Sequence, residues 1–311
     1  VLEPAPTAYH QRFYYTVYDV TGEILPGRKN AVGVILGNGF YNSAAEDPWH
    51  FDLATWRDDP KLCLELYSGE DLVFASGISW KSFPGPIRFH SLRNGEYYDA
   101  RMEFRAWTEP GFDDSRWHSV RLAKEPGGIP EEQAAEPCRV YETFELKDPN
   151  CFGVYDTHRN IAGHVRITLS GRAGETVSLD FNEQLLENGD LDTTHLAHFT
   201  KSGCFQHDEY ILKGDGIEVW EPKFTYHGFR YVRIGCNRKL VSIRKVEARV
   251  VGTDFATVGR IHSLSDGTLS NPGACRGVLP CEFCRHSDGL SSPGKKRLDR
   301  RCVDCLRNHA S

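Results

Sequence analysis

The sequence lacks any long hydrophobic run. None of its apolar stretches approaches the roughly 18 residues that a helix needs to span a bilayer. It also lacks an initiator Met and a signal peptide with a basic start and an apolar core. We therefore expect no membrane partner, and we expect the chain to begin inside a domain at Val1.

Neither sign of charge is in strong excess. The 37 Lys and Arg residues face 43 Asp and Glu residues, which gives a net charge of −6. Such a balance does not favour binding to a polyanion, so we expect no nucleic-acid partner. Hydrophobic residues make up 40% and charged residues 26% of the 311 positions, as in ordinary globular proteins, and this length suffices for two cores.

A long segment with helical periodicity is absent too, and no internal repeat is evident. Several segments instead alternate apolar and polar residues or are rich in aromatic and β-branched residues, which predicts strands. These segments are 13–18, 31–36, 61–67, 139–146, 164–169, 176–181, 229–234 and 246–251. Gly-rich turns separate many of them. The pattern predicts an all-β fold with two β-sandwich, jelly-roll-like domains followed by an irregular tail.

Composition divides the chain into three parts. A stretch rich in Pro, Glu and Gly covers residues 125–137, and strand patterning fades after about His262. We predict a first domain at residues 1–135, a second at 136–254, and a linker and tail at 255–311. The second domain is expected to form a complete sandwich, because two of its strands alternate apolar residues that can fill a core. These are Val165, Ile167 and Leu169 on one strand, and Val177, Leu179 and Phe181 on another.

The ten cysteines are unevenly placed. Five are scattered through the two predicted domains, at Cys63, Cys138, Cys151, Cys204 and Cys236. Their number is odd and their spacing matches no disulfide framework. We interpret them as free, partly buried thiols in a reducing compartment, which favours the cytoplasm.

Short motifs occur in a defined order along the chain. They run from Asn30–Tyr41 (NAVGVILGNGFY) through Gly95–Arg101 (GEYYDAR) and Gly111–Trp117 (GFDDSRW) to Phe224–Ile234 (FTYHGFRYVRI). The ordered set, above all FTYHGFRYV, resembles the family of bacterial α-L-rhamnosidases, and the resemblance covers about residues 1–255. It implies an N-terminal jelly-roll module whose first strands are missing, followed by a concanavalin-like β-sandwich.

In the second sandwich, Tyr155-Asp156 followed by Asn160–Gly163 resembles the family's D-x-G-Q-N-x-x-G entry to a strand. The sequence departs from that pattern at the Gly and the Gln. Further on, residues 229–234 alternate two sets of side chains, which predicts a packed strand rather than a substrate contact.

Other residues that could take part in catalysis or in sugar binding are expected to have structural roles. Glu96 and Asp99 could act as a carboxyl pair in hydrolysis, but they lie three residues apart in an apparent loop, which favours a role in a turn. Trp49, Trp56 and Trp80 could stack on sugar rings, yet a core role is the simpler interpretation for each of them.

The other five cysteines crowd into the tail. Cys281-x-x-Cys284, 17 further residues and Cys302-x-x-Cys305 have the spacing of a four-cysteine zinc site, in which four thiolates hold the metal tetrahedrally. Neighbouring Lys and Arg residues would suit a nucleic-acid binder. The alternative function is then a binding protein that contains a zinc ribbon. This is one interpretation of the tail.

A second interpretation accounts for more of the tail. Synonymous codons for Glu282–Cys305, read one base later, spell SFVGIPTDCPHREKNGWTGDASI. The family's catalytic domain carries a signature like IPTDCPHREKNGWTGDA, which the resemblance places shortly after residue 255. We therefore favour a frameshift between about Val258 and Cys281. The CxxC pairs are then accidents of an out-of-frame tail, and residues 265–311 are expected to lack a packed core.

The resemblance implies an inverting glycoside hydrolase that removes terminal α-L-rhamnose from glycans or glycosides. Such chemistry needs one carboxyl group to protonate the leaving oxygen and another to activate water. The codons for the signature's acids overlap residues 289–290, 294–295 and 301–302, so none is translated, and the (α/α)-barrel with the general base is never reached. We therefore expect no catalytic, cofactor-binding or metal-binding residue in this chain, which is inactive.

A rhamnose-containing glycan or glycoside is the partner that the resemblance implies. A non-catalytic carbohydrate-binding β-sandwich module is the alternative function for the same residues. Exposed aromatic side chains on a concave sheet would favour that alternative.

Overall fold

The computed structural model describes residues 3–43, 45–46, 49–194 and 205–255. Across these ranges the chain forms strands and two short 3-10 helices, η1 (Phe51–Leu53) and η2 (Ala100–Met102). The all-β prediction is confirmed. The predictions for the tail, including the zinc site at Cys281, Cys284, Cys302 and Cys305, lie outside the described residues.

No helix within the described ranges combines the length and the apolar character needed to cross a membrane.

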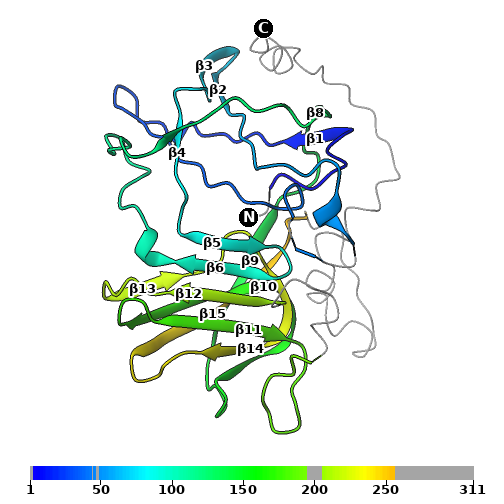
Figure 1. The fold of residues 1–311 in the computed structure, drawn as a ribbon, viewed down its shortest axis with the longest axis vertical. Coiled ribbons are helices and arrows are strands. Elements are labelled where there is room, and N and C mark those ends of the chain that lie inside the picture. The colour runs from blue at the N-terminus through cyan, green and yellow to red at the C-terminus, as the bar shows by residue number, and fades with distance from the viewer. Residues whose placement is uncertain (1–2, 44, 47–48, 195–204, 256–311) are drawn as a thin grey trace, which may run out of the picture.

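The first part of the chain forms small two-stranded sheets, seen in the upper half of Figure 1. The pairs are β1 (Arg12–Tyr15) with β8 (Ile129–Glu132), β2 (Glu65–Ser68) with β3 (Asp71–Ala75), and β4 (Lys81–Ser82) with β7 (His118–Ser119). The predicted strand at 31–36 is wrong, because these residues have no strand structure. Val32 and Ile35 in that run are about half exposed, so apolar character alone did not indicate a paired strand.

A nine-stranded sheet dominates the rest of the structure. Its order is β5-β6-β12-β11-β14-β10-β15-β9, with β13 paired to β10 off this path. The strands are β5 (Ile87–Ser91), β6 (Gly95–Asp99), β9 (Cys138–Leu146), β10 (Val154–Gly171), β11 (Thr176–Asn182), β12 (His207–Ile211), β13 (Ile217–Trp220), β14 (His227–Gly235) and β15 (Val241–Thr253). The sheet curls on itself in the lower half of Figure 1.

The 18-residue strand β10 turns the corner of this sheet. Its first half pairs with β14, and its second half, from Gly163 on, pairs with β15. A Cβ atom at Gly163 would lie 2.1 Å from the Arg249 carbonyl oxygen, so only glycine allows the two backbones to approach this closely. One long strand can therefore serve both layers of the sandwich.

The core lies between the layers of the curled sheet. The six side chains that the alternation of two strands assigned to the core are all 0% exposed: Val165, Ile167, Leu169, Val177, Leu179 and Phe181. They form one cluster with residues from β12, β14 and β15. Each buried aliphatic or aromatic side chain of this size contributes about 1.5–3 kcal/mol, which is the main stabilisation of this part of the chain.

The hairpin β5–β6 belongs to the same sheet, although it comes before residue 135. Strand β6 runs parallel to β12, with Tyr97 opposite Glu209. The two segments are about 110 residues apart in sequence, so the contact is strongly non-local. The division at residue 135 stays a prediction, but main-chain hydrogen bonds between strands connect the two parts.

A buried polar cluster holds this hairpin against the sheet. Asp208 on β12 accepts a hydrogen bond from the Glu96 backbone N–H at 2.9 Å, and the Nε2–H of His227 donates to its other oxygen at 3.0 Å. Glu96 accepts from the backbone N–H groups of Lys223 and Phe224, at 2.9 and 3.1 Å. The cluster therefore ties β6, β12 and β14 and the segment before β14 together.

The environment of Glu96 shifts its protonation. Its side chain is 0% exposed, and its second oxygen has no hydrogen-bond partner. Burial raises the pKa of Glu96 to about 7, helped by the negative Asp208 and opposed by the two backbone hydrogen bonds and by Lys223. Glu96 is therefore a buried carboxyl group that is partly neutral near neutral pH.

The cysteine prediction is wrong at one position. Cys138, at the start of β9, is disulfide-bonded, whereas Cys151 and Cys236 are free thiols as expected. Disulfides persist in oxidising environments, so the cysteines no longer support a reducing compartment.

The pH dependence of stability tests the Glu96 environment. Because its folded-state pKa of about 7 lies above the ordinary 4.5, the stability that it contributes is fully present below about pH 4.5 and is lost as pH rises through 7. We expect wild type to lose about 3 kcal/mol relative to Glu96→Gln between pH 5 and pH 8, since a tenfold change in proton affinity corresponds to about 1.4 kcal/mol. Urea unfolding at both pH values measures this.

The matched control is Glu145→Gln, at a half-exposed glutamate on β9. It should follow wild type at both pH values. A difference between wild type and Glu96→Gln that does not change with pH would contradict the shifted pKa.

Candidate functional site

The outer face of the curled sheet carries most of its charged side chains. On β11, Asp180 lies between the buried Leu179 and Phe181, so its side chain points away from the core. It is directly opposite His207 on β12 and Arg233 on β14. Because directly opposed residues share a face, the three side chains meet on the outer surface.

These side chains form an ion-pair network. His207 Nδ1 lies 2.6 Å from Asp180 and its Nε2 lies 3.0 Å from Glu209. Arg233 contacts Asp180 and Asp190, each at 3.1 Å. Asp190 belongs to the loop after β11, so Arg233 holds this loop against the sheet.

Two carboxylates control the charge of His207. Burial alone would lower its pKa, but the hydrogen bonds and charges of Asp180 and Glu209 outweigh burial and raise the pKa of His207 to about 9. The pKa of Asp180 is lowered, because His207 and Arg233 outweigh the effect of its burial. The imidazole is therefore positively charged at neutral pH, and the network is a set of fixed charges.

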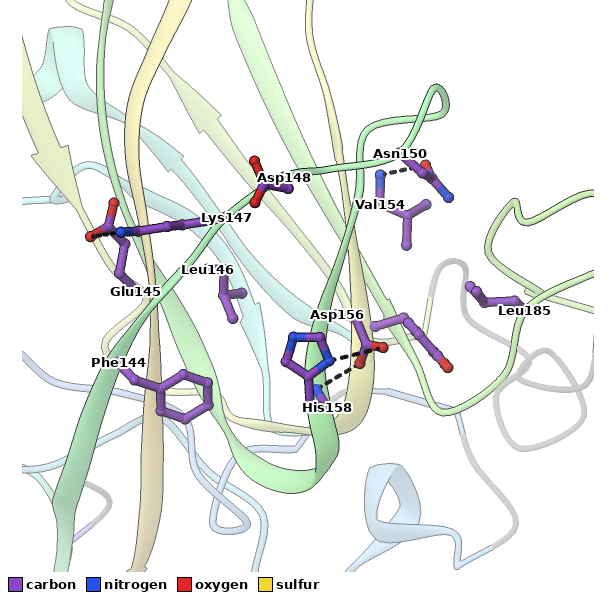
Figure 2. Close-up of a pocket in the computed structure, with 11 residues that line it drawn as sticks. Phe144, Glu145, Leu146, Lys147, Asp148, Asn150, Val154, Asp156, His158 and Leu185 are labelled. Atoms are coloured by element: carbon purple, nitrogen blue, oxygen red, sulfur yellow. Dashed lines mark hydrogen bonds and ion pairs between the residues drawn. The ribbon is translucent and has the colours of Figure 1, made fainter.

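A hollow of about 520 Å³ lies beside this network. Its lining comes from the end of β9, the loop that follows, the start of β10, the loop after β11, and Tyr231 on β14. Figure 2 shows Phe144 and Leu185 on opposite sides of the hollow, with Asp156 and His158 between them and Asp148 and Asn150 at its upper rim. The walls thus combine apolar, aromatic and carboxyl groups.

Asp156 is held rigidly in this hollow. The Arg230 guanidinium donates two hydrogen bonds to its carboxylate, at 2.9 and 3.0 Å, and the His158 backbone N–H donates a third at 2.6 Å. Burial would raise the pKa of Asp156, but these donors outweigh it and lower the pKa. Asp156 therefore stays ionised, which suits a fixed acceptor and not a proton donor.

The rim of the hollow is also ordered. The Asn150 side chain accepts from the backbone N–H groups of Phe152 and Val154 and donates to the Gly189 carbonyl at 2.7 Å. It thereby joins the loop after β9 to the loop after β11. Asp148 and His158 have φ values of 52° and 62°, a region that non-glycine residues occupy at some cost.

The structure places the candidate carboxyl pair apart. Glu96 is buried in the cluster with Asp208 and His227, whereas Asp99 caps η2 and pairs with Arg101 at 2.7 Å. The two carboxyl groups have separate structural roles. The expected turn role is wrong for Glu96, which lies in strand β6 and is buried, whereas Asp99 lies at the turn into η2. Among the described residues, no group of three or more His, Cys, Asp or Glu side chains could hold a metal ion.

The three tryptophans lie in the first part of the chain. Trp56 stacks on His10 and Trp80 packs near Phe74, with ring centroids 5.8 and 5.9 Å apart. Trp49 is 49% exposed, and the Arg93 guanidinium lies 3.8 Å from the centroid of its ring. Trp56 and Trp80 therefore have packing roles, whereas Trp49 keeps part of its surface open.

Comparison with known families covers both parts of the chain. The model of the alpha-L-rhamnosidase N-terminal domain matches residues 1–142, and that of the bacterial alpha-L-rhamnosidase concanavalin-like domain matches residues 148–252. Residues 1–252 belong to the bacterial α-L-rhamnosidase family. The resemblance inferred from the ordered motifs is confirmed.

Individual α-L-rhamnosidases resemble most of this chain. One from Formosa agariphila is 34% identical over 86% of this chain and 29% of its own length. One from Streptomyces avermitilis is 36% identical over 81% of this chain and 24% of its own length. The structure of α-L-rhamnosidase from Dictyoglumus thermophilum has a TM-score of 0.69 and 36% identity, over 81% of this chain and 28% of its own. The chain therefore spans less than a third of these relatives.

A second solved structure is that of the Streptomyces avermitilis α-L-rhamnosidase complexed with L-rhamnose. Its TM-score is 0.65 at 32% identity, and the match covers 81% of this chain and 24% of that one. The rhamnosidase fold therefore accounts for both the first part of the chain and the curled sheet.

The pH dependence of stability also tests the ion pairs of His207 on the outer face of the sheet. The folded-state pKa of His207, about 9, lies above the ordinary 6.5, so its stabilisation is fully present below about pH 6.5 and is lost as pH rises through 9. We expect His207→Gln to destabilise the protein by about 2 kcal/mol at pH 6, a value reduced for solvent screening of the partly exposed ring, and by much less at pH 10. Urea unfolding at the two pH values measures this.

His158→Gln is the matched control, because the His158 side chain is 86% exposed. It should change stability little at either pH. Equal destabilisation by His207→Gln at pH 6 and pH 10 would show that packing, and not the ion pairs, explains the loss.

Proposed function

We propose that this chain is the accessory β-domain part of an enzyme that hydrolyses terminal α-L-rhamnose from glycans or glycosides, and that the chain alone does not hydrolyse them. The observation that carries the proposal is the pair of family matches, which fit an N-terminal and a concanavalin-like domain. A rhamnose-containing substrate is supported by the relatives, which are α-L-rhamnosidases, and by the relative solved with L-rhamnose.

The chemistry of the described carboxyl groups supports the absence of hydrolysis. Inverting hydrolysis needs a protonated carboxyl group and a carboxylate about 6.5–9.5 Å apart on either side of the glycosidic bond. Glu96 has a pKa of about 7 that would suit a general acid, but it is 0% exposed and cannot reach a substrate. Asp156 faces the hollow, yet Arg230 keeps it ionised.

The frameshift remains part of this proposal. Residues 256–311 lie outside the described structure, so the argument for it is the one-base-shifted reading of Glu282–Cys305. That reading supplies the carboxyl groups that the family's signature needs at the place where the signature is expected. The zinc ribbon is the competing account of the same residues.

Activity measurements test the first part of the proposal. We expect the purified 311-residue chain to show no turnover of an aryl α-L-rhamnoside above the uncatalysed rate, because an out-of-frame tail does not supply the carboxyl groups of the family's signature. Release of the aryl group is followed by absorbance. Turnover that survives repurification would contradict the proposal, and a longer rhamnosidase serves as the positive control.

Sequencing of the coding DNA tests the second part. We expect the codons for Glu282–Cys305, read one base later, to spell IPTDCPHRE within an open frame. Any other reading would exclude the frameshift. Elemental analysis of the purified chain gives an independent check, since one stoichiometric zinc per chain would favour the zinc ribbon.

A further inference from the structure

We propose that Asn188 is a site of spontaneous deamidation, in which the backbone nitrogen of Gly189 attacks the Asn188 side chain and ammonia leaves. The chain contains three Asn-Gly pairs, at residues 38–39, 94–95 and 188–189. Glycine in the second position favours this attack, because no Cβ atom hinders the approach of its nitrogen. The sequence alone therefore offers three equivalent sites, and the fold selects one of them.

The reaction needs no reagent except water. The Gly189 nitrogen loses its proton to hydroxide and forms a bond to Cγ of Asn188, while the Cγ–Nδ2 bond breaks and the amide nitrogen takes up a proton and leaves as ammonia. Water then opens the cyclic succinimide at either of its carbonyl carbons. One opening gives aspartate at position 188, and the other gives isoaspartate, in which the main chain continues through Cβ and Cγ. The net change is the gain of water and the loss of ammonia.

Asn188 lies exposed in the turn after β11. The Leu186 N–H donates to the Asp190 carbonyl at 2.8 Å and closes this turn. The Asn188 Oδ1 accepts a hydrogen bond from the Asp190 N–H at 2.9 Å. That bond folds the Asn188 side chain back over the peptide that follows it, which brings Cγ toward the Gly189 nitrogen, and the donor polarises the carbonyl group that is attacked.

Little in the turn opposes the attack. The N–H of Gly189, which must lose its proton, donates to the Leu186 carbonyl at 2.9 Å. A single hydrogen bond in an exposed turn opens at low cost in free energy. Within the described part of the chain, the Asn188 amide nitrogen donates to no acceptor, so the leaving group is not held.

The sheet protects Asn94 from the same reaction. Asn94 is 1% exposed, and its Oδ1 accepts from the Ser91 hydroxyl at 3.1 Å. Its carbonyl accepts from the His207 N–H at 2.8 Å, and a Cβ atom on Gly95 would lie 1.8 Å from the His207 carbonyl oxygen. The Gly95 backbone is therefore packed against β12, and its nitrogen cannot approach Cγ of Asn94 without breaking this contact.

Hydrogen bonds on both ends of its amide group protect Asn38. Its Nδ2 donates to the His90 carbonyl at 3.4 Å, and its Oδ1 accepts from the Asn42 side chain at 3.0 Å. The Asn38 backbone N–H also donates to the His90 ring. Attack by the Gly39 nitrogen has to reorient this half-buried side chain, so Asn38, like Asn94, reacts only after local opening of the structure.

Deamidation at Asn188 changes a turn that ties two loops together. The Gly189 carbonyl accepts from Asn150 Nδ2 at 2.7 Å, and Asp190 pairs with Arg233 at 3.1 Å. Isoaspartate lengthens the turn between Leu186 and Asp190 by one main-chain atom, which displaces the Gly189 carbonyl from Asn150. Aspartate keeps the length of the main chain and adds only a charge. Isoaspartate, and not aspartate, therefore loosens the loop after β9.

Peptide mapping by mass spectrometry of the folded 311-residue chain, kept warm at pH 8, tests the site. We expect Asn188 to deamidate about tenfold or more faster than Asn38 and Asn94, which must wait for local opening. The rate at Asn188 should rise with pH in proportion to hydroxide. In guanidinium chloride all three should react at similar rates, since glycine follows each of them. Similar rates in the folded chain, or protection of Asn188 by folding, would overturn the proposal.

Hydrogen exchange of the aged chain tests the effect on the loops. The N–H groups of Phe152 and Val154 donate to the Asn150 side chain, and we expect them to exchange about threefold to tenfold faster once isoaspartate has formed. Asn188→Gln is the matched control: its longer side chain closes a ring less readily, so ageing should change neither its mass nor its exchange. Freshly prepared Asn188→Asp should exchange as fresh wild type. Unchanged exchange in a sample rich in isoaspartate, or ageing of Asn188→Gln at the wild-type rate, would contradict the proposal.

Discussion

The carboxylate of Asp208 is the constraint on which the arrangement of the sheet depends. It is completely buried and is held by one donor from β6 and one from β14, while its own strand β12 lies between them in the order of the sheet. A buried charge of this kind is tolerated only when it is paired and hydrogen-bonded. The hairpin β5–β6 must therefore stay in register with β12. Burial, together with the negative charge of Asp208, raises the pKa of the neighbouring Glu96.

The same sheet places two different surfaces on its two sides. Strict alternation sends Leu179 and Phe181 to the core and leaves Asp180 outside. On β14 the alternation breaks, since Phe229, Val232 and Ile234 are all buried, and the pairing with β10 shifts register at the same place. This bulge brings Arg230 to Asp156 and leaves Tyr231 at the hollow, so an irregularity of the strand shapes the candidate site.

Local pattern and family resemblance predicted much of this fold. Alternation identified the core residues of β10 and β11, because the two-residue period of apolar side chains along a strand can be recognised from the sequence alone. It failed at residues 31–36, whose apolar character reflected no pairing. The packed strand predicted at residues 229–234 is confirmed, but its alternation is interrupted by a bulge that depends on a partner strand some 70 residues away. The ordered motifs gave the family, but most of their residues are structural: Glu96 was expected in a turn and is buried in a strand.

The sequence alone did not reveal the candidate site, because the site also depends on contacts between distant strands. Asp148, Asp156 and Tyr231 come from three separate segments, and only strand register brings them to one hollow. The resemblance drew attention to Asp156 as part of a strand entry, and its actual role is to anchor Arg230 beside Tyr231. Since the Arg230 guanidinium and the His158 backbone N–H hold the pKa of Asp156 below its ordinary value, this carboxylate suits a fixed hydrogen-bond acceptor and not a proton donor.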